Sequence, residues 1–332
     1  MRIDTTAELK RKFDITLSRE QSIALITHKK PDGDGLAACL AFQELLLKHY
    51  KRPADIVLEE PPPAVYEFLN AADRCITFSS DMHYDIVVQM DCHEPSRVGT
   101  CEPLLQHANS VFAIDHHHEK EIQPESITFI DIEAASTGEI LYRMFSSEII
   151  RLPRPAALYI ANALYTTILN DTDNFVNSNT KGSTFAICEA LCQLGLNPAY
   201  ITRSFIMGKT PTELKFTGQV FETIEIHCNG QIMFVHSTLK MLEYMGLNQS
   251  ATSKLTRLLK GAKGVKVLVY FQQGDASSFR LSLRSDTVDV NKLARRFGGG
   301  GHTQASGCTI SGSLSLVKQT MLNALMELLG DG

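Results

Sequence analysis

The sequence lacks the features of a membrane-spanning, secreted or disulfide-bonded protein. No stretch approaches the roughly 18 uncharged residues that a membrane span needs. The segment 1–13 is charged throughout and has no apolar core of a secretion signal. The eight cysteines include no CxxC pair, and only Cys188 and Cys192 are close together, which favours reduced core thiols over disulfides or a zinc knuckle. We therefore expect a cytoplasmic protein with no membrane partner.

A strong basic excess is also absent. The 32 Lys and Arg residues are outnumbered by 37 Asp and Glu residues, which gives a formal net charge of −5. No basic footprint therefore argues for long nucleic acid as a partner. Short anionic substrates remain open, because a local site can be positive on an acidic protein. Two bound divalent cations would bring the protein close to neutral.

The composition that remains is that of an ordinary globular protein, 44% hydrophobic and 21% charged, without internal repeats. At 332 residues the chain is expected to form two domains. In residues 1–190, short apolar runs alternate with helical patterns, which predicts an α/β domain with a mostly parallel sheet. The predicted strands are 22–27, 54–58, 85–90, 111–114 and 127–130. The predicted helices are 35–49, 63–70, 137–150 (with Ser136-Thr137 as its N-cap), 155–169 and 181–194.

The pattern changes towards the C-terminus. Residues 191–225 are expected to form a linker that ends in a connecting helix at 210–225, with Pro211 in its first turn. Residues 226–332 are predicted to form a smaller α+β domain. Its predicted strands are 231–236, 265–271 and 279–284, and its predicted helices are 288–297 and 313–329.

Clusters of acidic residues and histidines follow three of the predicted strands. His28, Asp32 and Asp34 come after 22–27, and Pro31 and Gly33 impose a tight turn on this cluster. Taken alone, this turn favours a cap for the next helix over a metal site. Two further clusters, Asp91-Cys92-His93-Glu94 and Asp115-His116-His117-His118, follow the strands at 85–90 and 111–114. Ligands of open α/β sheets bind beyond the carboxyl ends of the strands, so the three clusters are expected to converge.

A fourth cluster, Asn170 to Phe175, follows the helix 155–169 and contains Asp171. The candidate metal ligands are two histidines and four carboxylates: His28, Asp32, Asp34, Asp91, His116 and Asp171. Imidazole and carboxylate without thiolate disfavour structural zinc and fit Mn²⁺, with Mg²⁺ or Fe²⁺ as alternatives. If Asp91 bridges, His28 and Asp32 complete one metal site and the other three ligands complete a second. Two such ions activate water for attack on a phosphoryl group, and no Ser/His/Asp or Cys/His arrangement is evident.

The last motif is the glycine run 298–301 followed by His302. A flexible helix stop is the plainer interpretation, but glycine N–H groups can also turn towards an anion. In the preceding strand, Phe279, Leu281 and Leu283 share one face, which places Arg284 on the other. Arg284 and His302 are therefore expected to hold a phosphate on one polar surface.

Taken together, these motifs resemble the DHH phosphoesterase superfamily, named for the Asp-His-His seen here at Asp115, His116 and His117. The N-terminal catalytic domain is matched through HKKPDGD, DCHEPSRVG, DHH and DTDNF, and the DHH-associated C-terminal domain through LRS and GGGGH. The resemblance thus covers nearly the whole chain. The length and the GGGGH-type second domain are similar to the NrnA-type bifunctional oligoribonucleases and 3′-phosphoadenosine 5′-phosphate (pAp) phosphatases.

That resemblance implies a hydrolase with two Mn²⁺ ions that degrades short oligoribonucleotides, including the linear dinucleotides pGpG and pApA, to mononucleotides, and pAp to AMP. It implies that Asp91, His116 and His117 are catalytic, with His117 on the substrate phosphate rather than on a metal. It also implies that the second domain faces the metal site across a cleft; a homodimer stays open. The substrate-binding residues that it implies are Arg97, His117, Arg284, Ser285, Gly299, Gly300, Gly301 and His302.

Three other functions are compatible with a metal site of this kind. An inorganic pyrophosphatase or exopolyphosphatase would share the metal site, but the GGGGH domain argues against it. A RecJ-like single-strand exonuclease is disfavoured because aromatic residues do not alternate with a basic stripe. A nucleotide sensor would bind ligand without hydrolysis.

The chain departs from the family pattern at a few positions. Gly35-Leu36-Ala37-Ala38 stands where Ala-x-Gly-Ser is frequent, and Asp173 stands where glycine commonly follows Asp-Thr. These departures bear on the substrate range more than on catalysis, because the metal ligands are intact. The additional His93 and His118 are expected beside the site or on the surface.

Overall fold

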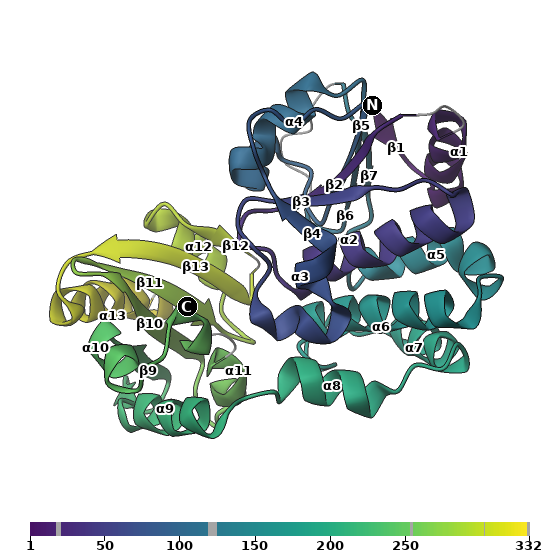
Figure 1. Ribbon diagram of the computed structural model, residues 1–332. Helices are drawn as coiled ribbons and strands as arrows, with labels where there is room; N and C mark the ends of the chain where they lie inside the picture. Colours follow the sequence, from purple (N-terminus) through teal and green to yellow (C-terminus); the bar gives the residue numbers. More distant parts are fainter. Residues whose placement is uncertain (18–20, 119–124, 253–254, 302, 331–332) are drawn as a thin grey trace. The chain divides into compact units, whose positions relative to one another are not determined.

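The structure is a computed structural model that describes residues 1–17, 21–118, 125–252, 255–301 and 303–330 (Figure 1). The chain forms two compact units, Met1–Gly208 and Lys209–Gly332. The division falls inside the segment 191–225 that was expected to link two domains. Across the described ranges, no helix combines the length and the apolar character needed to cross a membrane.

The first unit is built on a seven-stranded sheet with the order β1-β7-β6-β5-β2-β3-β4. All of its strand pairings are parallel, which confirms the predicted α/β class. The strands are β1 (Arg2–Ile3), β2 (Ile23–Thr27), β3 (Asp55–Leu58), β4 (Cys75–Thr77), β5 (Ile86–Met90), β6 (Ser110–Asp115) and β7 (Ile127–Ile130). The α-helices are α1 (Thr6–Thr16), α2 (Gly33–Leu45), α3 (Ala71–Arg74), α4 (Glu102–His107), α5 (Thr137–Ile150), α6 (Arg154–Asp171), α7 (Gly182–Gln193) and α8 (Pro198–Ile206).

Alternation along the buried strands produces a separate core on each face of this sheet. Ile23 and Leu25 of β2 pack with residues of α1, α2, α5 and α6 on one face. Figure 1 shows these four helices beside the sheet. Ala24 and Ile26 pack on the other face against α4 and the 3₁₀ helix η3 (Pro95–Cys101). Because both faces are covered, the strands read as continuous apolar runs.

Some elements differ from those the sequence predicts. The helix expected at 63–70 is the 3₁₀ helix η2 (Ala64–Leu69). The α-helix expected at 35–49 is α2, which ends at Leu45 and continues as the π-helical turn η1 (Leu46–Tyr50). Helix α5 has the predicted bounds, and Ser136 is its N-cap, with its hydroxyl accepting from the backbone N–H of Glu139 at 3.2 Å.

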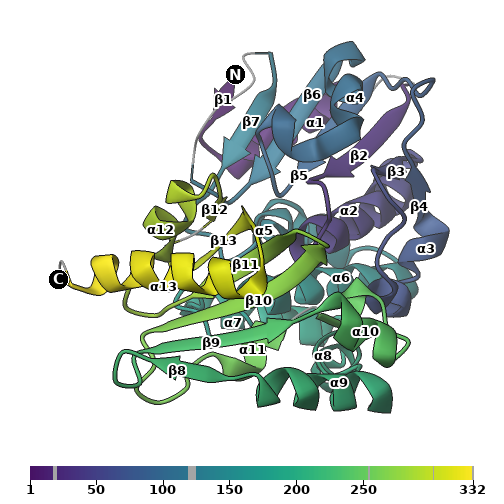
Figure 2. The ribbon, with the colours of Figure 1, turned by 90° about the vertical axis from the view of Figure 1, so that its left-hand side faces the viewer.

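The second unit contains a six-stranded mixed sheet with the order β12-β13-β11-β10-β9-β8. Its strands are β8 (Glu225–His227), β9 (Ile232–Ser237), β10 (Val267–Asp275), β11 (Ser278–Arg284), β12 (Gly300–Gly301) and β13 (Ala305–Ser311). Its helices are α9 (Pro211–Glu222), α10 (Leu239–Tyr244), the 3₁₀ helix η4 (Gln249–Thr252), α11 (Leu255–Leu259), α12 (Val290–Arg296) and α13 (Leu314–Gly330). Helices α12 and α13 cover one face of the sheet, and α9, α10 and α11 cover the other (Figure 2).

Candidate metal centre

The strand order of the first sheet brings three of the polar clusters together. Strands β2, β5 and β6 are neighbours in parallel pairing, so their carboxyl ends lie at one edge. His28 directly follows β2, Asp91 directly follows β5, and His116 directly follows β6. This edge is where ligands of parallel α/β sheets bind.

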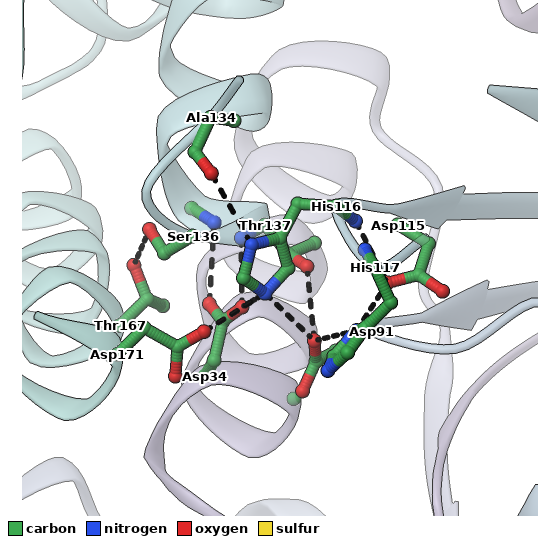
Figure 3. Close-up of polar contacts among 12 residues, drawn as sticks. Asp34, Asp91, Asp115, His116, His117, Ala134, Ser136, Thr137, Thr167 and Asp171 are labelled. Carbon is green, nitrogen blue, oxygen red and sulfur yellow. Dashed lines mark hydrogen bonds and ion pairs between the residues drawn. The ribbon is translucent and has the colours of Figure 1, made fainter. Parts of the chain in front are cut away.

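Asp91 lies at the middle of this arrangement. It is 2% exposed and has a left-handed backbone with φ of 60°, a conformation that Asp and Asn adopt more readily than other non-glycine residues. Its Oδ2 lies 3.4 Å from His28 Nε2, whereas its Oδ1 lies 3.5 Å from His116 Nε2 (Figure 3 shows the second contact). A carboxylate that faces two imidazoles through different oxygens has the geometry of a bridging ligand.

The turn after β2 places His28 and Asp32 on one side of Asp91. His28 Nε2 lies 3.7 Å from Asp32 Oδ1, and the other ring nitrogen, Nδ1, lies 3.0 Å from the carbonyl oxygen of Lys29. Asp32 is also the N-cap of α2, since its Oδ1 accepts from the N–H groups of Asp34 at 2.9 Å and Gly35 at 3.3 Å. The capping interpretation and the ligand interpretation are therefore compatible.

His116 faces three carboxylates through one nitrogen (Figure 3). Its Nε2 lies 2.8 Å from Asp171 Oδ2 and 3.5 Å from both Asp34 Oδ2 and Asp91 Oδ1. This buried nitrogen makes no well-directed hydrogen bond with any described residue. Its Nδ1 is 3.3 Å from the carbonyl oxygen of Ala134 and donates to it, which leaves Nε2 to face the carboxylates and to bind an ion once it has lost its proton. This arrangement fits a divalent cation between the ring and the acids.

Asp34 is held by the start of α5. The N–H of Thr137 donates to its Oδ2 at 2.7 Å and the N–H of Gly138 donates to its Oδ1 at 3.3 Å (Figure 3). The Thr137 hydroxyl also donates to Asp91 Oδ1 at 3.4 Å. The sequence identified this helix start only as a cap, and its contact with Asp34 depends on tertiary packing.

Asp171 is the last residue of α6, and the chain after it turns sharply. Asp173, Asn174 and Phe175 all have left-handed backbones, with φ of 50°, 59° and 68°. The side-chain amides of Asn177 and Asn179 donate to the carbonyl oxygen of Asp171 at 2.8 and 3.2 Å. A left-handed residue 173 explains why glycine suits this position, and Asp is among the few residues that replace it at modest strain.

The six sequence-predicted ligands thus fall into two groups that share Asp91. In each group, one candidate ligand atom per residue lies within 4.8 Å of all the others; the groups are Asp34, Asp91, His116 and Asp171, and His28, Asp32 and Asp91. A third group, Asp91, His116 and His117, overlaps the first. The division matches the two-ion assignment made from the sequence.

The electrostatics of the cluster indicate a surplus of negative charge. Burial and the nearby Asp91 and Asp171 carboxylates raise the pKa of Asp34 well above its usual range. Burial opposes protonation of His28, yet hydrogen bonds and charges from Asp32 and Asp91 raise its pKa to about 11. Each shift favours proton uptake, and a divalent cation would supply the same positive charge.

Asp115 is the centre of a hydrogen-bond network beside the candidate metal ligands. It is fully buried, and its Oδ1 accepts from the backbone N–H of His116 at 2.7 Å and faces His117 Nδ1 at 2.8 Å. Its Oδ2 lies 2.6 Å from Nδ1 of the buried His93. Burial opposes ionisation of Asp115, but His117 and His93 lower its pKa. The sequence places Asp115 only in the Asp-His-His motif, and His93 and His118 beside the site or on the surface. In the structure His93 is buried beside the site, whereas His118 is exposed.

Arg97 lies in η3 next to the metal ligands. It is half-buried, and its carbonyl oxygen accepts from the N–H of Lys29 at 2.7 Å. The segment predicted to bind substrate is therefore joined to the turn that carries His28.

The remaining predicted substrate residues lie in the second unit. Arg284 pairs with Ala305 of β13, and Gly301 pairs with Ser306, so both flank the same end of β13. The Ser285 hydroxyl accepts from the backbone N–H groups of two residues in the following turn. His302 lies outside the described residues.

The glycine run itself is only partly available to an anion. The N–H groups of Gly298 and Gly299 donate to carbonyls of α12, and Gly300 pairs with β13. Gly299 has to be glycine, since a β-carbon there would lie 2.1 Å from the Gly307 carbonyl oxygen.

Two family models match this chain, one in each unit. The DHH family N-terminal domain matches residues 22–168, and the DHHA1 domain matches residues 234–331. The chain belongs to the DHH phosphoesterase family and is a hydrolase acting on phosphoester bonds.

Among its relatives are bifunctional oligoribonucleases and PAP phosphatases named NrnA. The chain is 27% identical to a probable NrnA of Streptococcus mutans, over 86% of this chain and 88% of the relative. It is 24% identical to NrnA of Bacillus subtilis, over 89% and 91%. Its fold is similar to a crystal structure of an exopolyphosphatase-related protein from Bacteroides fragilis, with a TM-score of 0.86, 18% identity and coverage of 96% and 95%.

Proposed function

We propose that this protein hydrolyses very short oligoribonucleotides, including pGpG and pApA, to mononucleotides, and removes the 3′-phosphate of pAp to give AMP. The observation that supports this most is Asp91, whose two oxygens face the histidines of two separate ligand groups. The activities named for the NrnA relatives agree with it. Its eight free cysteines suit the reducing cytoplasm, where we expect it to act.

The ligand chemistry favours two Mn²⁺ ions, with Mg²⁺ or Fe²⁺ as alternatives. When bound, two such ions neutralise a phosphoryl group and lower the pKa of a water molecule. The residues that would hold them are His28, Asp32, Asp34, Asp91, His116 and Asp171.

We assign the substrate phosphate to His117 and the nucleotide end to the second unit. Asp115 orients the His117 ring through Nδ1 and raises the pKa of that histidine against the effect of burial. A fixed, positively charged imidazole suits a phosphate oxygen. Arg97 would add charge beside His28. The groups proposed for the nucleotide end are Arg284, Ser285, Gly299, Gly300, Gly301 and His302.

Product analysis tests the proposal. Ion-free protein is loaded with Mn²⁺ or Mg²⁺ and given pGpG, pApA, a labelled trinucleotide, pAp and inorganic pyrophosphate in parallel. We expect mononucleotides from the oligonucleotides and AMP plus phosphate from pAp. Hydrolysis of pyrophosphate alone would replace the proposal with a pyrophosphatase, and turnover of none of the five would reject it.

A further inference from the structure

Thr27 carries a buried hydroxyl for which the fold gives no structural reason. It is the last residue of β2, immediately before His28, and is 4% exposed. Its Oγ1 makes no hydrogen bond to any residue that the structure describes. Burying an unpartnered hydroxyl is unfavourable, and valine would fill the same volume in the strand without it.

Gly35 is the matching anomaly on the neighbouring element. It lies in the first turn of α2, where alanine would favour the helix. A β-carbon at residue 35 would lie 2.1 Å from Thr27 Oγ1. The helix therefore needs glycine at this point because the hydroxyl occupies the space.

The space shared by these two residues adjoins the proposed bridging ligand. The position of a β-carbon on residue 35 lies 3.4 Å from Asp91 Oδ2, the oxygen that faces His28. The other oxygen, Oδ1, already receives the hydroxyl of Thr137 at 3.4 Å. The place that a β-carbon of residue 35 would take is thus bordered by the Thr27 hydroxyl on one side and by Asp91 Oδ2 on the other.

We propose that Thr27 is a positioning residue of the metal centre, whose hydroxyl supports the Oδ2 side of Asp91, and that Gly35 is glycine to admit it. The buried hydroxyl of Thr27 and the glycine in helix α2 each lower stability, and this shared role explains both. This inference rests on the proposed metal-dependent function.

Titration of MnCl₂ into ion-free protein tests it, with the melting temperature as a second readout. Thr27→Val should weaken Mn²⁺ binding about ten- to a hundredfold without lowering the melting temperature, whereas Thr27→Ser should stay within about threefold of wild type. The control Thr128→Val removes a buried hydroxyl from β7 of the same sheet and should leave Mn²⁺ binding unchanged.

The double variant separates the hydroxyl from packing. Gly35→Ala should lower both the melting temperature and the Mn²⁺ affinity, because the new β-carbon collides with Thr27. Thr27→Ala with Gly35→Ala restores the room, so the melting temperature should recover while Mn²⁺ binding stays weak. Recovery of Mn²⁺ affinity in the double variant, or wild-type affinity in Thr27→Val, would overturn the inference.

Measurement of Mn²⁺ binding also separates the role of Thr27 from the proposed substrate assignment. If Mn²⁺ binding follows the expected pattern but neither pGpG nor pAp is hydrolysed, the role of Thr27 stands and the substrate assignment fails. A wild-type protein that binds no Mn²⁺ overturns both.

Discussion

At the scale of single residues, the candidate ligands are oriented by contacts on their far sides. His28 and His116 each direct Nδ1 at a backbone carbonyl, which leaves Nε2 to face carboxylates. Asp34 is fixed by two backbone N–H groups and Asp115 by two histidines. Such outer contacts set the tautomer and direction of each ligand before an ion arrives.

Asp91→Asn should reduce kcat for pGpG at least about a hundredfold, because both ligand groups lose a shared negative oxygen. Asparagine tolerates the left-handed backbone at residue 91, so the fold should be retained. Steady-state kinetics at saturating Mn²⁺ measure the effect, and the exposed Asp73→Asn is the control. Near-normal turnover would remove Asp91 from the bridging position.

Mn²⁺ binding should release protons at pH 7. The raised pKa values of His28 and His116 mean that both rings are protonated imidazolium ions in the ion-free protein. The proton on Nε2 must leave before that nitrogen can bind a metal. The affinity should therefore rise with pH from 6 to 8. Calorimetric titration in buffers of different ionisation enthalpy counts the protons, and a count of zero would contradict the assignment.

His93 should act on His117 through Asp115. Asparagine at residue 93 can place its amide near the position of Nδ1 and keep the contact with Asp115, whereas phenylalanine removes the donor. We expect His93→Phe to lower kcat about ten- to a hundredfold and His93→Asn to retain most of it. Steady-state measurement of kcat and KM for both variants tests this role of His93. An equal loss of kcat in the two variants would indicate that His93 contributes only by packing.

At the scale of elements, the sequence predicts what depends on local pattern. Apolar runs that end in acids and histidines locate β2, β5 and β6 and hence His28, Asp91 and His116. Strand order is not local: only pairing of β5 between β2 and β6 brings the three together. Strand β13 was missed for a related reason, since its Gly- and Ser-containing sequence forms a strand through pairing with β11 and β12.

The contact between α5 and α6 offers an element-scale test. A β-carbon on Gly138 would lie 1.9 Å from Thr167 Oγ1 of α6, so Gly138→Ala should push the start of α5 away. We expect a loss of about 1–3 kcal/mol in the free energy of unfolding and weaker Mn²⁺ binding, because this start holds Asp34. Urea denaturation and Mn²⁺ titration measure both effects. Gly182→Ala, which meets nothing within 4 Å, should change neither.

The double variant Gly138→Ala with Thr167→Ala tests whether this contact causes the loss of stability. Removing the hydroxyl and the methyl group that collide should recover part of the unfolding free energy, because the Thr167 β-carbon, 2.8 Å from the new β-carbon, stays in place. If the pair adds rather than compensates, the two helices do not interact through this contact.

At the scale of the whole molecule, the proposed roles divide between two units with separate cores. Every candidate metal ligand lies in the first unit, whereas Arg284, Ser285 and the glycine run lie in the second. A division of this kind would separate the proposed cation binding from the proposed recognition of the nucleotide. It also allows each to be lost without the other.

Arg284→Ala should therefore raise KM for pGpG and pAp about tenfold or more while leaving the Mn²⁺ titration unchanged, because a charge-assisted contact to phosphate is removed far from any metal ligand in the sequence. Arg280→Ala is a matched control, since Arg280 lies on the same strand and the same face of β11 and is exposed. His302→Ala should follow Arg284→Ala if both hold the same anion. Unchanged KM and kcat in Arg284→Ala and His302→Ala would exclude this edge of the second unit from substrate binding. Weakened Mn²⁺ binding in either variant would show that metal binding and substrate binding are not separate.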